Sequence, residues 1–100
     1  MKRYDVLKEF IKRLRNDDIA IFAGKEMSKE AFQYDREGNF YVSSTHSIAP
    51  ALAMGLASGT SKRIFVFSGE GTFLREAGTA IQMFASRLVN LFYVILKLCL

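Results

Sequence analysis

Apolar residues follow two patterns along this chain, short continuous runs and stripes at helical spacing. The continuous runs have the length of strands and cover residues 19–23, 40–42, 64–67 and 91–96. Such runs are typical of parallel strands that are covered on both faces. The stripes predict helices over about 3–15, 28–32, 47–58 and 72–87. Helix and strand therefore alternate four times, which predicts an α/β fold, a three-layer parallel sheet with helices on both faces.

The expected helix boundaries rest on a few local signals. Asn16, Asp17 and Asp18 end the first helix, and Ser28 and Ser47 are plausible N-caps of the second and third. The third helix, over about 47–58, has no polar face. We therefore expect this helix to be buried on nearly all sides.

Length and charge narrow the picture further. The chain has 100 residues, which predicts a single domain over 1–100. Its net charge is +4, without any run of four basic residues, so nucleic-acid binding has little support. Residues 41–61 contain no Lys, Arg, Asp or Glu. A span this long without charge is typical of a core or of a subunit interface, and both alternatives stay open.

The compartment is expected to be the reducing cytoplasm. The one cysteine, Cys99, allows neither an internal disulfide nor a cysteine-based metal site. The N-terminal stretch is charged and amphipathic, unlike a signal peptide. The most apolar window, residues 88–100, is 13 residues long and includes Asn90 and Lys97, so it is too short to span a bilayer.

Candidate chemistry lies where strands end, because ligands of open parallel sheets bind at the carboxyl ends of the strands. The segment 68–72 is the most informative of these loops. Gly69 and Gly71 allow a tight turn, and the amides of Gly71 and Thr72 can hold a phosphate at a helix start. Glu70 fits beside a phosphate only with a hard cation such as Mg²⁺ between them. The pattern indicates a metal-bridged diphosphate, or alternatively a plain glycine-rich turn with an exposed glutamate.

The same segment resembles the cofactor motif of thiamine-diphosphate-dependent 2-oxo-acid decarboxylases, which begins Gly-Asp-Gly and ends in asparagine after a further strand. Upstream segments look like the diphosphate-binding domain of the sulfopyruvate and phosphonopyruvate decarboxylases. They follow in the same order and cover residues 17–24, 28–30, 39–42, 47–49 and 55–57. The resemblance extends over nearly the whole chain, to about Leu96.

The resemblance implies roles for particular residues around the diphosphate. Glu70 stands where the family has its metal-binding aspartate. Gly69, Gly71 and Thr72 would supply the turn and the amides, and Gly24 would approach the phosphates from the first strand. The implied cofactors are thiamine diphosphate and Mg²⁺.

A second group of residues would line the thiazolium and pyrimidine rings of the cofactor. Ser44, Thr45 and His46 lie on the loop that does so in the family. His46 is the only histidine, and it is either a loop residue bonded to the backbone or a group facing cofactor or substrate. The position of the closing asparagine falls at about Leu98, which cannot ligate a metal.

The resemblance implies one part of a lyase that acts on a small 2-oxo acid. The acidic group that activates the cofactor lies on a separate pyrimidine-binding subunit in this family, so we expect no activity from the chain alone. Family domains continue beyond the equivalent of Leu100, so the chain is expected to be truncated. The alternatives are a remnant or subunit-pairing module without cofactor, and a nucleotide-binding module unrelated to thiamine.

The last apolar run predicts association with another chain. Residues 91–96 have no element after them to cover or pair them. Unpaired backbone groups on an apolar strand favour pairing between molecules. We therefore expect a homo- or hetero-oligomer.

Overall fold

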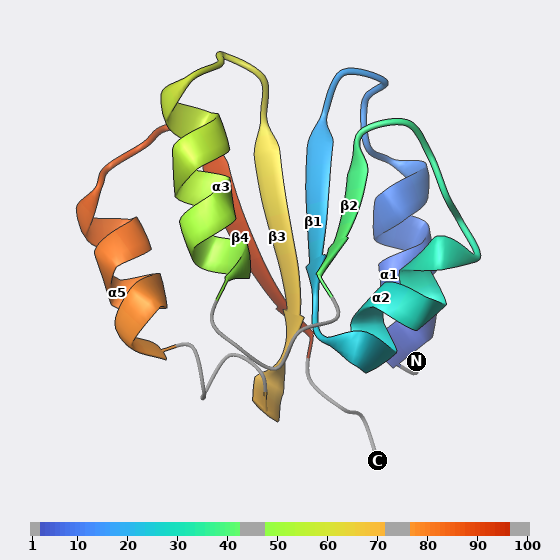
Figure 1. The fold of residues 1–100 in the computed structure, drawn as a ribbon. Helices are drawn as coiled ribbons and strands as arrows, with labels where there is room; N and C mark the ends of the chain where they lie inside the picture. The colour runs from blue at the N-terminus through green and yellow to red at the C-terminus, as the bar shows by residue number, and fades with distance from the viewer. Residues whose placement is uncertain (1–2, 43–47, 72–76, 97–100) are drawn as a thin grey trace.

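The computed structural model describes residues 3–42, 48–71 and 77–96, which form four strands and the helices around them (Figure 1). In chain order the elements are α1 (Arg3–Lys12), β1 (Ile19–Ala23), α2 (Lys25–Phe32), β2 (Asn39–Val42), α3 (Ala49–Ser58), β3 (Ile64–Gly69), α5 (Ala77–Ala85) and β4 (Leu91–Leu96). None of the helices in the described ranges is both long and apolar enough to cross a membrane.

The four strands form one parallel sheet in the order β2-β1-β3-β4. Helices α1 and α2 cover one face of the sheet, and α3 and α5 lie on the other (Figure 1). The expected three-layer α/β fold is confirmed. Its two outer strands are β2 and β4, while β1 and β3 lie in the centre.

The two faces of the sheet have different cores because successive side chains of a strand point to opposite sides. On the α1–α2 face the core is aromatic, with Phe22 and Phe67 stacked at 5.0 Å between ring centroids and Phe10 edge-on to Phe67 at 5.1 Å. On the α3 face small residues of the helix pack against Ile21 and Val66. All six residues of β3 are buried, which explains its continuous apolar run.

The second helix begins earlier than the sequence indicates. We expected Ser28 as its N-cap, and this prediction is wrong because Gly24 holds the cap position. Ser28 lies within α2, is buried, and donates a hydrogen bond from Oγ to the carbonyl of Phe22 at 3.1 Å. Its hydroxyl therefore ties the helix to β1. Ser47, the other expected cap, lies outside the described residues.

Helix α3 is buried on one side only, so the expectation of burial on nearly all sides is wrong. Ala49, Ala53 and Ala57 are buried against β1 and β3. The outer side, including Leu52 and Gly55, is exposed. An uncharged helix can thus contribute half its surface to the core and leave the other half accessible. The inner half is core; the interface alternative stays open for the outer half.

Two other helices end sooner than the apolar stripes predict. α1 ends at Lys12 rather than near residue 15, and α5 ends at Ala85 rather than near 87. Arg87 has a φ of 56°, in the left-handed region that a helix does not contain, and the chain turns there toward β4. The stripe extends beyond α5 because Leu88 packs on the core from outside the helix.

Candidate functional site

The segments expected to carry chemistry end at the same edge of the sheet, the edge formed by the carboxyl ends of the strands. In the ladder, Ala23 at the end of β1 is the partner of both Val42 and Ser68. The residues that follow, Gly24 and Gly69, therefore lie next to one another along this edge. The amide of Gly24 donates to the carbonyl of Val42 at 2.8 Å, which closes the edge between β1 and β2.

Gly24 has a backbone conformation that favours glycine. Its φ is 96° and its ψ is 154°, a backbone conformation that residues with a Cβ atom rarely adopt. This conformation turns the chain from β1 directly into α2, whose Ser28 amide donates to the Gly24 carbonyl at 3.0 Å. No side chain caps the start of α2. The sequence motif thus places a helix start at the carboxyl edge.

Gly69, Glu70 and Gly71 lead the chain from the interior to the solvent. Gly69 is the last residue of β3 and is buried, whereas Glu70 and Gly71 are exposed. A Cβ added to Gly71 would meet no heavy atom within 4 Å. The space beside Gly71 is therefore open to a ligand, and the neighbouring residue Glu70 is exposed.

The expected metal site has one carboxylate among the described residues. Glu70 lies at the carboxyl edge, but within the described ranges there is no group of three or more His, Cys, Asp or Glu that could hold a metal ion. Ser44, Thr45, His46, Thr72 and Leu98 lie outside the described residues. Their expected roles stay predictions.

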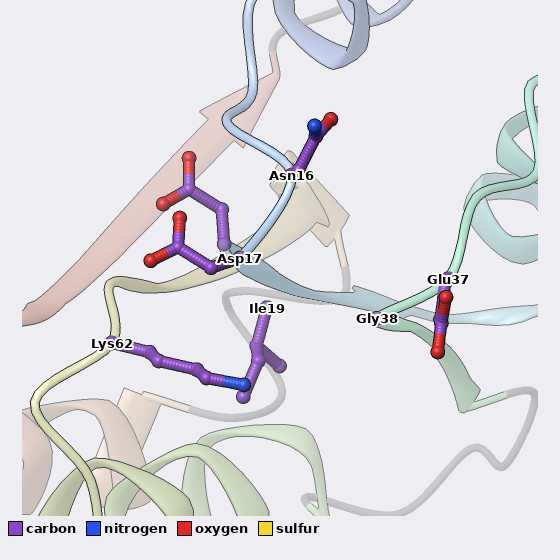
Figure 2. Close-up of a pocket in the computed structure, with 7 residues that line it drawn as sticks. Asn16, Asp17, Ile19, Glu37, Gly38 and Lys62 are labelled. Carbon is purple, nitrogen blue, oxygen red and sulfur yellow. The ribbon is translucent and has the colours of Figure 1, made fainter.

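The opposite edge, where the amino ends of the strands meet, contains a pocket that the sequence did not indicate (Figure 2). Its volume is about 320 Å³. Its lining comes from the turns before β1, β2 and β3 and from the first residue of β1, namely Asn16, Asp17, Asp18, Ile19, Glu37, Gly38 and Lys62. The pocket is formed by these turns and does not include the segment 68–72, for which the sequence predicted a phosphate and metal site.

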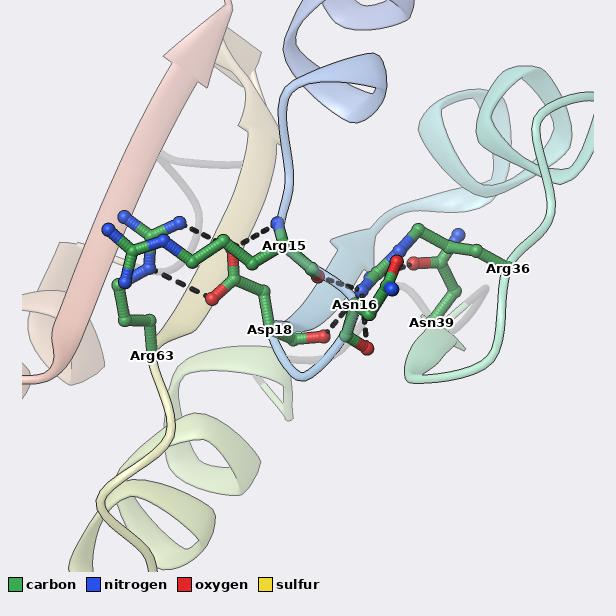
Figure 3. A network of polar contacts seen from close by, with 6 residues as sticks. All are labelled: Arg15, Asn16, Asp18, Arg36, Asn39 and Arg63. Carbon is green, nitrogen blue, oxygen red and sulfur yellow. Dashed lines mark hydrogen bonds and ion pairs between the residues drawn. The ribbon is translucent and has the colours of Figure 1, made fainter.

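A network of hydrogen bonds surrounds Asp18 at this amino edge of the sheet (Figure 3). Asp18 is 1% exposed and accepts hydrogen bonds from Nε and Nη2 of Arg63 at 2.8 and 2.5 Å, and from the Arg15 amide at 2.7 Å. These bonds, led by those from the Arg63 side chain, hold the pKa of Asp18 below its ordinary value despite its burial. Three hydrogen bonds from the protein therefore satisfy most of the acceptor capacity of this carboxylate.

Arg36 extends this network to the turn before β2. Its Nη2 donates to the carbonyls of Arg15 at 2.7 Å and Asp18 at 2.8 Å, and its Nη1 donates to Oδ1 of Asn39 at 3.0 Å. The sequence placed Asp18 in a helix-ending turn and in the segment 17–24 that carries the family resemblance, without a hydrogen-bonding role. An acid directly before an apolar strand was the available signal in the sequence, but nothing there identified Arg36 or Arg63 as its neighbours.

Tyr41, near the end of β2, has a pKa above its ordinary value. Burial, and then a hydrogen bond to Asp35, raise the pKa of Tyr41 to about 12. The hydroxyl donates to Oδ1 of Asp35 and accepts from Nδ2 of Asn39 at 3.1 Å. The ring stacks on Phe22 at 5.6 Å. Tyr41 therefore stays protonated at neutral pH and connects β2 to the turn before it.

Comparison with known proteins shows similarity to two decarboxylase subunits of the same name. No protein-family model matches the chain. It is 29% identical over 79 residues to the beta subunit of sulfopyruvate decarboxylase from Methanocaldococcus jannaschii, covering 78% of this chain and 42% of that protein. It is 28% identical over 80 residues to the subunit of the same name from Methanococcus maripaludis, covering 79% and 43%. The chain thus spans about two fifths of the length of the curated relatives it matches, and over most of its own length it is similar to part of a sulfopyruvate decarboxylase beta subunit.

Proposed function

We propose that this chain is the thiamine-diphosphate- and Mg²⁺-binding part of a 2-oxo-acid decarboxylase of the sulfopyruvate or phosphonopyruvate type. The observation that carries the proposal is the meeting of Gly24 and the Gly69-Glu70-Gly71 segment at the carboxyl edge of a parallel sheet. The similarity to two decarboxylase beta subunits supports the same reaction class.

The backbone at this edge fits a diphosphate. The start of α2 has free amides near Gly24 because no side chain caps it, and helix starts favour anions. The open space at Gly71 lets a phosphate approach the main chain closely. Thr72, and the loop residues Ser44, Thr45 and His46, are assigned to the cofactor by the resemblance alone.

The exposed carboxylate of Glu70 fits a shared divalent cation. Mg²⁺ in proteins commonly takes one or two carboxylates and completes its coordination with substrate phosphates and water. One acidic ligand from this chain is compatible with that chemistry. Glu70 is one methylene longer than the aspartate of the family motif, so its reach to the cation differs.

In such a decarboxylase the bound thiamine diphosphate supplies an electron sink for the cleaved carbon–carbon bond. The residues of this chain bind and orient the diphosphate, and the group that activates the pyrimidine comes from a separate pyrimidine-binding subunit. The chain is therefore inactive alone, and its substrate is a small 2-oxo acid. The proposed setting is the cytoplasm.

Calorimetric titration with thiamine diphosphate in Mg²⁺, with and without a candidate pyrimidine-binding subunit, tests the proposal. Replacing Glu70 removes the charged ligand, so Glu70→Ala is expected to weaken Mg²⁺-dependent binding at least about tenfold while the fold stays intact. The matched control is Glu37→Ala, an exposed glutamate at the opposite edge, with an expected change of less than about twofold. Equal affinities of Glu70→Ala and the parent protein would contradict the assignment.

A second candidate function is pairing with a partner subunit without cofactor binding. The described ranges favour it, because they contain no group of three or more His, Cys, Asp or Glu that could hold a metal ion. The same titration separates the two functions. Complex formation with a pyrimidine-binding subunit, in the absence of any Mg²⁺-dependent cofactor binding, would support the pairing module.

A further inference from the structure

Ser28 is a buried polar residue of α2 that has no part in the proposed chemistry. It is 6% exposed and lies on the buried side of the helix with Met27 and Ala31, which belong to the core on this face of the sheet. Its hydroxyl donates to the Phe22 carbonyl at 3.1 Å. A buried hydroxyl needs a hydrogen-bond partner, and here the partner belongs to β1. Burial and bond together fix the side chain between the helix and the strand.

Two hydrogen bonds from Ser28 hold the turn between β1 and α2. The hydroxyl donates to Phe22 before the turn, and the Ser28 amide donates to the Gly24 carbonyl within it at 3.0 Å. The Gly24 amide donates in turn to the Val42 carbonyl of β2 at 2.8 Å. Because glycine has more backbone freedom than any other residue, these bonds limit the directions in which the chain can leave β1.

The first amides of α2 depend on this turn for their direction. Lys25, Glu26 and Met27 begin the helix, and the first amides of a helix have no acceptor within it. Within the described ranges no side chain caps them and no loop carbonyl accepts from them. They follow Gly24 directly, at the carboxyl edge where a diphosphate is proposed to bind. A change in the Gly24 turn would therefore redirect these donors.

The other serine hydroxyl bonds in the described part of the chain are more local. Each runs to a carbonyl at most four residues away, from Ser58, Ser68 and Ser86. The hydroxyl of Ser28 donates across six residues, from a helix to the strand before it. It therefore joins two elements, whereas the others stabilise the segment in which they lie.

We propose that Ser28 is a positioning residue for the diphosphate site, whose hydroxyl holds the Gly24 turn so that the first amides of α2 face the carboxyl edge. This inference rests on the proposed function, which places a diphosphate at that edge. Ser28 is buried and acts through Gly24, so it does not touch the cofactor. Removing its hydroxyl weakens diphosphate binding beyond any general loss of stability.

Amide hydrogen exchange of the cofactor-free protein, followed by NMR, tests the effect on the turn. Ser28→Ala removes the hydroxyl and keeps the amide. We expect exchange at Gly24 and at residue 28 to become at least about tenfold faster, because their hydrogen bonds then open locally. The Ala20 amide, which donates to the Gly38 carbonyl near the other end of β1, is the internal reference and is expected to change less than about twofold.

Calorimetric titration with thiamine diphosphate in Mg²⁺ tests the effect on binding. Ser28→Ala is expected to raise the dissociation constant about fivefold, whereas Ser28→Thr keeps the hydroxyl and is expected to stay within about twofold of the parent. Ser58→Ala is the matched control, because it removes a serine hydroxyl that donates to the Met54 carbonyl at 2.7 Å. Ile64→Val, a buried truncation at the start of β3, controls for lost stability. Both controls are expected to leave the dissociation constant within about twofold of the parent.

The outcomes separate this inference from the proposed function. Equal affinities of Ser28→Ala and the parent, or equal changes in exchange at Gly24 and Ala20, would overturn the role of Ser28 and leave the proposed function standing. A loss of affinity as large in Ser28→Thr or Ile64→Val as in Ser28→Ala would overturn that role as well. A parent protein that binds no thiamine diphosphate in Mg²⁺, with or without a pyrimidine-binding subunit, would overturn both.

Discussion

The two edges of the sheet contain similar residues in opposite environments. At the amino edge, Asp18 is buried with every bond supplied by the protein, and Gly38, at a φ of 94°, lies against it. At the carboxyl edge, Glu70 is exposed and Gly71 has open space beside it. An acid next to glycine therefore has a structural role at one edge and an accessible, ligand-ready position at the other. The two acids differ in their surroundings: Asp18 accepts hydrogen bonds from Arg63 and from the Arg15 amide, whereas Glu70 is exposed to solvent.

The largest expected effect comes from removing the charge of Asp18. Asp18→Asn removes a buried carboxylate that accepts three hydrogen bonds and leaves the partly exposed Arg63 without its counter-charge, and hydrogen bonds to a charged group are among the stronger ones. We expect the free energy of unfolding, measured by urea denaturation at neutral pH, to fall by about 3 kcal/mol.

The control for this prediction is at the other edge. Glu70→Gln changes an exposed carboxylate and is expected to alter the free energy of unfolding by less than about 0.5 kcal/mol. Similar losses in the two variants would contradict the contrast between the edges.

A smaller loss of stability is expected when Gly38 at the amino edge is replaced by alanine, and almost none when Gly71 at the carboxyl edge is replaced. A Cβ at Gly38 would come within 2.9 Å of the Asp18 carbonyl oxygen, at a φ that side chains rarely adopt. We therefore expect Gly38→Ala to lower the free energy of unfolding by about 2 kcal/mol. Gly71→Ala meets nothing within 4 Å, so thermal unfolding should show a midpoint close to that of the parent. A larger loss in Gly71→Ala than in Gly38→Ala would reverse the roles assigned to the two edges.

The smallest expected effect is a change in how the free energy of unfolding depends on pH. Because the folded-state pKa of Asp18 lies below its ordinary value of 3.8, the unfolded chain binds more protons in the interval between the two. The contribution of Asp18 to stability is therefore complete above pH 3.8 and is lost as the pH falls toward the lower folded-state pKa. Urea midpoints measured from neutral to acid pH should fall less steeply in Asp18→Asn than in the parent. Identical slopes in Asp18→Asn and the parent would contradict a charged, hydrogen-bonded Asp18.

Much of the fold could be predicted because its signals are local. Continuous apolar runs identified all four strands. For the central strands β1 and β3 the reason is coverage on both faces, which leaves little room for polar side chains, whereas β2 and β4 have apolar runs although they are partly exposed. Helix starts were less predictable. Ser28 has the chemistry of an N-cap, yet the tight turn at Gly24 starts α2 earlier and leaves Ser28 to bond Phe22. The outer side of α3 could not be assigned either, because an apolar helix does not show how many neighbours it has.

Of the candidate site, the sequence indicated the segments and the structure shows which of them are neighbours. Glycines beside an acid after a buried strand identified residues 69–71 as a turn with chemistry. The strand register then places Gly24 beside Gly69, through pairing between segments about 45 residues apart in the ladder of Ala23 and Ser68. The Asp18 network was missed for the same reason, since Arg63 is 45 residues from Asp18.

The sequence by itself determined the alternation of helix and strand and the parallel, doubly covered character of the sheet. Both follow from side-chain hydrophobicity and spacing within a few residues. Only the tertiary structure decided the strand order β2-β1-β3-β4 and the hydrogen bonds that Arg36 and Arg63 donate to Asp18 at the amino edge. These features depend on which distant segments become neighbours. Hydrogen bonding and burial, rather than local propensity, select those neighbours.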